Sequence, residues 1–125
     1  RKNDEEARQN AEFIADFERA VNETAKKIIA KLPKKLESLA RLGEAEVSYE
    51  LYRFAYTSET GECDGDLKRL KRLGVEIDSV LLRKFCDDNH LELYIEVDDY
   101  LSLHDDYSGS GRNVFARVCL PNIYD

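Results

Sequence analysis

The sequence predicts a single α+β domain spanning residues 1–125, with helices on one face of a three-stranded, mainly antiparallel sheet. Three observations lead to this class. Apolar residues recur at helical spacing through the first third of the chain, and three later segments alternate apolar and polar residues. Two short helical patterns separate the first alternating segment from the second. A chain of this length can bury a core without help from metals or disulfides.

The chain should open with a long amphipathic helix over residues 4–32. Its acidic start and its lysine-rich end both suit the helix dipole. Because Pro33 lacks a backbone donor, we expect either a kink at this residue or a break. After a break, Pro33 would open a second helix that Gly43 ends. The apolar stripe of the first helix consists of Ile14, Phe17, Val21, Ile28 and Ile29.

A first strand is expected over residues 45–56, where side chains alternate between two faces. One face would carry Val47, Tyr49 and Leu51, and the other Ser48, Glu50, Tyr52, Phe54 and Tyr56. Residues 57–66 contain glycines, small polar residues and acids, which indicate a loop. This assignment places large aromatic side chains on the polar face of the strand.

Two short helices should follow, over residues 67–73 and 80–88. Each is bounded by residues that commonly cap helices. The expected N-terminal caps are Asp66 for the first helix and Asp78 or Ser79 for the second, and the expected stops are Gly74 and Asn89. The two helices therefore lie between the first strand and the remaining two.

Two further strands are expected over residues 91–97 and 114–120, joined by a long loop over residues 98–112. Each strand has one apolar face, so the helices should cover that face and leave the other exposed. The expected core consists of Ile14, Phe17, Val21, Ile28, Leu36, Leu39, Val47, Leu70, Leu81, Phe85, Leu93, Ile95, Val97, Val114, Ala116 and Val118.

The order of these elements resembles that of winged-helix DNA-binding domains, in which a loop between the last two strands forms the wing. The resemblance implies that the second short helix enters a DNA groove. Its exposed residues, however, would be Arg83, Lys84, Asp87 and Asp88, whose charges cancel, and the wing position carries Asp98, Asp99, Asp105 and Asp106. Basic residues that could contact phosphate are Lys68, Arg69, Lys71 and Arg72.

The charge of the chain argues against general affinity for nucleic acid or anionic lipid. The formal net charge is -7, and the acidity lies in the part that carries the strands. Residues 1–44 contain ten Lys/Arg and nine Asp/Glu, whereas residues 45–125 contain nine and seventeen. Acidic loops of this kind suggest a further alternative, an inhibitor that mimics DNA and occupies the groove of a basic partner.

No catalytic, cofactor-binding or metal-binding constellation is predicted. The three cysteines form no metal-binding spacing, and their odd number does not indicate a disulfide framework. Cys86 and His90 are four residues apart, but the negative end of a helix disfavours a thiolate, so Cys86 should be a buried, inert thiol. The acidic loops offer too few carboxylates for a calcium site.

The polar face of the sheet is the remaining candidate surface. Cross-strand pairs there would stabilise the sheet, and tyrosine and arginine also suit protein partners. We therefore expect a non-catalytic protein-interaction module of a soluble, cytoplasmic protein, with winged-helix nucleic-acid binding and DNA mimicry as the alternatives. The expected interaction surface consists of Tyr94, Asp98, Asp99, Tyr100, Asp105, Asp106, Tyr107 and Arg117.

No membrane partner and no cofactor are expected, and nucleic acid is an unfavoured partner. The first helix would be about 40 Å long at 1.5 Å per residue, which exceeds the span of a small sheet. Part of its apolar stripe, between Ala7 and Phe17, would then extend beyond the domain. This geometry favours a homodimer through the N-terminal helix.

Overall fold

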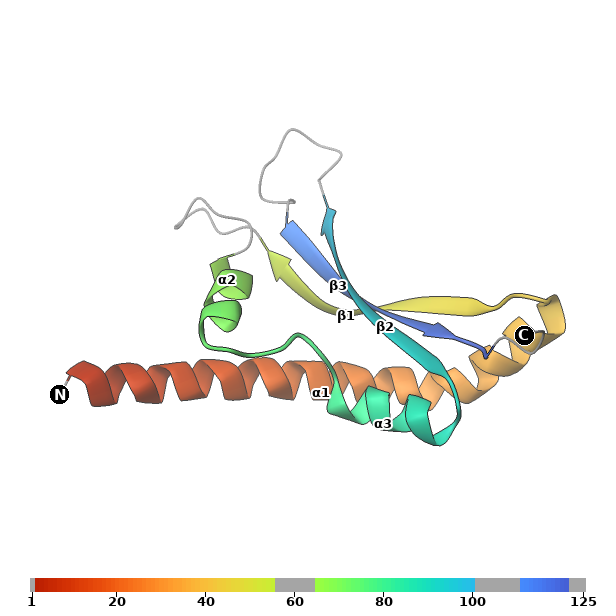
Figure 1. Ribbon diagram of the computed structural model, residues 1–125, viewed down its shortest axis with the longest axis horizontal. Helices are drawn as coiled ribbons and strands as arrows, with labels where there is room; N and C mark the ends of the chain where they lie inside the picture. Colours follow the sequence, from red (N-terminus) through yellow and green to blue (C-terminus); the bar gives the residue numbers. More distant parts are fainter. Residues whose placement is uncertain (1, 56–64, 101–110, 122–125) are drawn as a thin grey trace.

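The computed structural model describes residues 2–55, 65–100 and 111–121. Three helices and a three-stranded antiparallel sheet follow one another in the predicted order (Figure 1). The elements are α1 (Lys2–Leu42), β1 (Glu46–Ala55), α2 (Gly65–Arg72), α3 (Val80–Asp88), β2 (Glu92–Tyr100) and β3 (Gly111–Cys119). The expected α+β class is therefore confirmed.

Helix α1 runs without a break through Pro33, so of the two alternatives expected there the break, with a second helix starting at Pro33, does not occur. Proline removes one backbone hydrogen bond and bends a helix without necessarily ending it. Figure 1 shows the axis of α1 bending in its C-terminal part, toward the start of β1. Along its length α1 packs against both β1 and α3.

All three helices end in the same way, with a residue of positive φ just past the last turn. Gly43 (φ 73°) and Gly74 (φ 76°) have this role, as expected. After α3 it belongs to His90 (φ 57°), whereas the predicted stop, Asn89, has φ -107°. The following amide then bonds back across the turn, for example from Leu91 N to Cys86 O at 2.8 Å.

The sheet has the order β1-β3-β2, with β3 in the centre and both pairings antiparallel. Val118, Ala116 and Val114 of β3 alternate on the helix-facing side and are fully buried. Strand β2 extends to Tyr100 and pairs with β3 up to Gly111, so both ends of the expected loop belong to strands. The sequence pattern does not predict this extension, because the adjacent residues Asp98 and Asp99 have a low strand propensity and interrupt the alternation.

A β-bulge between Glu50 and Tyr52 changes which side of β1 faces the helices. Leu51 is the extra residue and is buried, and Tyr52 lies opposite Val114 on the helix-facing side. The expectation that Tyr52 and Phe54 share the polar face is therefore wrong. Their rings contact Phe17 of α1 at centroid distances of 4.8 and 6.0 Å.

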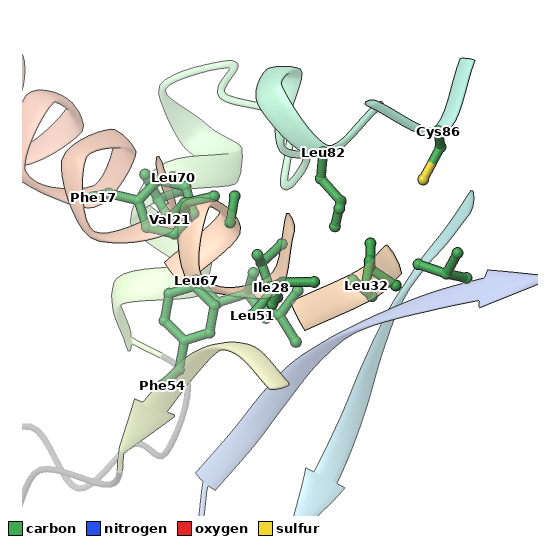
Figure 2. Close-up of a cluster of buried hydrophobic side chains, with 14 residues drawn as sticks. Phe17, Val21, Ile28, Leu32, Leu51, Phe54, Leu67, Leu70, Leu82 and Cys86 are labelled. Atoms are coloured by element: carbon green, nitrogen blue, oxygen red, sulfur yellow. The ribbon is translucent and has the colours of Figure 1, made fainter. Parts of the chain in front are cut away.

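One main hydrophobic core joins α1, α2, α3 and the sheet. Figure 2 shows side chains of all three helices and of β1 converging on it. Its buried members are Phe17, Val21, Ala25, Ile28, Leu32, Leu51, Phe54, Leu67, Leu70, Leu82, Cys86, Val114, Ala116 and Val118. Of the expected core, Ile14 and Leu39 lie outside this cluster, although Leu39 is itself buried. The expected core residues that are only partly buried against the cluster are Leu36, Val47, Leu81, Phe85, Leu93, Ile95 and Val97. None of the described helices is long and apolar enough to cross a membrane.

Candidate interaction surface on the open face of the sheet

The side of the sheet away from the helices carries a regular set of polar and aromatic side chains, which we call the open face. Strand register places its residues in rows across β1, β3 and β2. The three rows are Glu46–Cys119–Glu92, Ser48–Arg117–Tyr94 and Glu50–Phe115–Glu96. Because the helices pack on the opposite side, these side chains are exposed or half-buried, with Cys119 the exception (Figure 1).

Arg117 lies at the centre of the open face and links all three strands. Its guanidinium donates to Glu46 Oε2 at 2.9 Å and to Glu96 Oε1 at 2.8 and 3.1 Å. These hydrogen bonds lower the pKa of Glu46 and raise that of Arg117. The two glutamates lie on diagonally opposite corners, so one cation holds both edge strands to the centre.

Tyr94 lies beside this centre and adds an aromatic surface. The Arg117 guanidinium stacks over its ring, 4.6 Å from the centroid. The Tyr94 hydroxyl donates to Glu92 Oε2 at 3.1 Å, and this hydrogen bond raises the pKa of the phenol. Tyr94 is nevertheless 44% exposed, which makes it one of the few large apolar side chains open to solvent among the residues that the structure describes.

The Cys119 thiol lies at the margin of the same network. It donates to Glu46 Oε2 at 3.6 Å and accepts from Arg117 Nη1 at 3.7 Å. Burial is the main cause that raises its pKa, and the neighbouring Glu46 carboxylate raises it further. A protonated, buried thiol is a poor nucleophile, so Cys119 serves packing and hydrogen bonding.

Four glutamates form the corners of the open face. Glu46 and Glu50 on β1, and Glu92 and Glu96 on β2, are each four residues apart, or about 13 Å along the strand. The two edge strands lie about 10 Å apart, two strand spacings. Glu50 pairs with Arg53 at 2.9 Å, so every corner has an internal partner. The face is acidic and also held in one arrangement.

Of the expected interaction surface, Tyr94 and Arg117 come together on the open face. For Asp98, Asp99 and Tyr100 the structure describes only the backbone, which lies in β2 opposite Asn113, Arg112 and Gly111. Asp105, Asp106 and Tyr107 lie outside the described residues. Sequence reasoning missed Glu46 and Cys119, although Glu46 has the same parity along its strand as Ser48 and Glu50.

Three basic residues of the helix pair, Arg69, Arg83 and Lys84, have partners within the domain. Arg83 bonds twice to Asp78, at 2.8 and 3.2 Å, and Lys84 pairs with Asp88 at 3.2 Å. Arg69 donates to Asn10 of α1 and stacks over Phe13. The backbones of α2 and α3 scarcely approach each other, which differs from a compact helix-turn-helix.

Cys86 lies in the hydrophobic core. It is 1% exposed, and burial raises the pKa of its thiol, with Asp87 adding to the effect. Within residues 2–55, 65–100 and 111–121, no three His, Cys, Asp or Glu side chains gather closely enough to hold a metal ion.

An apolar cleft of about 390 Å³ lies between α1 and the start of α3. Its most exposed member is Val80, at 81%, the first residue of α3. The cleft is lined by Phe17, Glu18, Val21, Asn22, Val75, Glu76, Asp78, Val80 and Leu81. Of its charged residues, Asp78 is held by Arg83 and by the amide of Ser79.

Comparison with known proteins adds nothing to this geometry. No protein family matches the chain, and neither the curated proteins nor the solved structures contain a match.

Proposed function

We propose that this domain is a non-catalytic protein-interaction module of a soluble intracellular protein, and that it binds a basic partner segment through the open face. The observation that carries the proposal is the arrangement of Arg117 and Tyr94 between four glutamates on a face that the helices leave uncovered. Tyrosine, phenylalanine and arginine are enriched at protein interfaces, and all three occur here.

The chemistry of the partner follows from the charge of the open face. The face carries Glu46, Glu50, Glu92 and Glu96 against two arginines, Arg53 and Arg117. Each carboxylate has further acceptor positions, so lysine or arginine side chains of a partner can bind without displacing Arg117. The ring of Tyr94 and the half-buried Phe115 offer apolar contact between these charges.

The internal hydrogen bonds also favour binding. A partner that meets Arg117, Glu46 and Glu96 finds side chains that are already ordered, so less conformational entropy is lost on association. The same network gives a second explanation of the face, as a device that only stabilises the sheet. The two roles predict different effects of replacing Tyr94: partner binding should weaken if the face is an interface, whereas no binding should be affected if the face only stabilises the sheet.

The test is a titration of a labelled peptide of alternating lysine and valine, followed by fluorescence anisotropy. The native protein should bind with salt-sensitive affinity, and Tyr94→Ala should weaken binding about tenfold, or about 1.4 kcal/mol. Tyr49→Ala, on the helix-facing side of β1, is the matched control and should bind as the native protein does. Equal binding by native protein and Tyr94→Ala would overturn the proposal.

Winged-helix binding of nucleic acid is supported by the order of elements but opposed by the charges. Each of Arg83, Lys84 and Arg69 has a partner within the domain. A contact with phosphate would have to compete with that partner, which lowers the affinity these residues can contribute. DNA mimicry is supported by the four carboxylates at regular spacing. A titration of the protein with duplex DNA tests the winged-helix function, because a winged-helix domain would bind the duplex and neither of the other two functions requires it.

A homodimer through α1 is the remaining proposal about partners. The exposed N-terminal section of α1 projects past α2 and supports it (Figure 1). That section carries Ala7 and Ala11 among charged residues, so any contact between copies there is small and polar. Sedimentation equilibrium decides this: a monomer at high protein concentration rules the dimer out.

A further inference from the structure

A second surface, opposite in charge to the open face, lies between α1 and the edge strand β1. Figure 1 shows β1 running back over the C-terminal part of α1. A groove of about 430 Å³ is lined by residues of both elements. It is lined by Ala30, Lys31, Lys34, Lys35, Ser38 and Tyr49, and we call it the lysine groove.

The lysine groove holds three cations without a counter-charge. Lys34 and Lys35 follow Lys31 by three and four residues, which places each of them beside Lys31 on the helix surface, where like charges repel. Among the described residues none of the three has an ion-pair partner, whereas Arg83, Lys84 and Arg117 all do. Between residues 26 and 41 the chain carries six Lys/Arg and one Glu. An anion bound here would relieve this repulsion.

The shape of the groove favours an extended acidic peptide over other kinds of anion. Within the described residues β1 pairs with β3 alone, so its other edge offers unpaired backbone groups beside the groove. Tyr49 projects from this edge strand, and burial raises the pKa of its hydroxyl, which therefore remains a donor. The lysine stems and the tyrosine ring supply apolar walls between the charges.

Nucleic acid fits the groove less well. The net charge of -7 repels a polyanion as it approaches, and neutralising many phosphates requires a longer basic track than one groove. A short acidic segment needs only a few carboxylates to match the three lysines. We propose that the lysine groove binds an extended, acidic segment of a partner protein, which adds a strand to the free edge of β1 and places its carboxylates on Lys31, Lys34 and Lys35.

The experiment is a fluorescence-anisotropy titration of the full chain with a labelled peptide of alternating glutamate and valine. The native protein should bind it with an affinity that falls as salt rises. Replacing Lys31, Lys34 and Lys35 together by glutamine should weaken binding about tenfold. The matched control replaces Lys26, Lys71 and Lys84, which have the same charge and lie outside the groove, and should stay within about twofold of the native affinity.

Three outcomes would overturn the proposal. The first is equal binding by the native protein and the groove variant, and the second is an equal loss in the control variant. The third is competition in which duplex DNA or inorganic phosphate displaces the peptide from the native protein at lower concentration than unlabelled peptide does. Tyr94→Ala should leave this binding unchanged, so the result is independent of the open face. Circular dichroism of each variant checks that it remains folded.

Discussion

Arg117 and Glu96 share two hydrogen bonds diagonally across the β2–β3 ladder, with lengths of 2.8 and 3.1 Å. On its other side Arg117 reaches Glu46 of β1, so a single side chain joins the two edge strands that never touch each other. The consequence is a polar face whose side chains are ordered before any partner arrives. Each of these hydrogen bonds restricts side chains that would otherwise move freely on a charged surface.

Replacing Glu46 by glutamine should change how stability depends on pH. Hydrogen bonding to Arg117 lowers the pKa of Glu46 in the folded protein. A lowered pKa stabilises the fold above the unfolded value of about 4.5, and this contribution disappears as pH falls through the folded value. In urea unfolding, the difference between native protein and Glu46→Gln should be largest near neutral pH and vanish in acid.

The control for this experiment is Glu23→Gln, the same change at an exposed position of α1. It should follow the native protein at every pH. A difference between native protein and Glu46→Gln that is constant from neutral to acid pH would contradict the role given to Arg117.

Phe17→Ala should lower the free energy of unfolding by about 3–5 kcal/mol, because the ring is buried and its loss leaves a cavity. Phe17 is 4% exposed and contacts the rings of Tyr52 and Phe54. Phe85→Ala should cost less, since Phe85 is only partly buried against the core. Chemical denaturation measures both, and an equal loss from the two variants would contradict the described packing.

The bulge in β1 explains why sequence reasoning identified Phe17 but misplaced its partners. Alternation predicts a strand correctly, yet it assumes a period of two throughout. The extra residue Leu51 moves Tyr52 and Phe54 to the buried side, and nothing in the local pattern marks the shift. The side on which Tyr52 and Phe54 lie is set by the register of β1 with β3, a strand distant in sequence.

The sequence likewise predicted some residues of the open face but not the contacts between them. Tyr94 and Arg117 follow from alternation within their own strands, because each is polar or amphipathic between apolar neighbours. The partnership of Arg117 with Glu46 requires the strand order β1-β3-β2, which no single segment encodes. The lysine groove depends on α1 continuing past Pro33, and sequence reasoning left that choice open.

Substitutions at the helix ends should have opposite signs. Gly74→Ala places a side chain on a backbone of φ 76° and should destabilise the protein by about 1 kcal/mol. His90→Gly relieves the same conformation, φ 57°, and should stabilise it by several tenths of a kcal/mol or more. Thermal unfolding of both variants tests this, and the same sign for the two changes would contradict the assigned backbone geometry.

Ser79→Ala should destabilise the protein by about 1 kcal/mol. The Ser79 hydroxyl accepts a hydrogen bond from the amide of Leu82 at 3.2 Å, and Ser79 is 1% exposed. Alanine leaves that amide without a partner in a buried position. Ser79→Thr, which keeps the hydroxyl, should recover part of the loss. Urea unfolding that shows alanine and threonine to be equivalent would rule out the cap.

The most direct test of the proposed interaction is an NMR titration of isotope-labelled protein with the lysine–valine peptide. We expect amide shifts to concentrate on the open face, at Glu46, Tyr94, Glu96, Phe115 and Arg117, and to saturate. They should shrink as salt rises, because the contacts are largely ionic. Shifts confined to α2 and α3, or no saturable shifts at all, would contradict the claim that this face binds a basic partner.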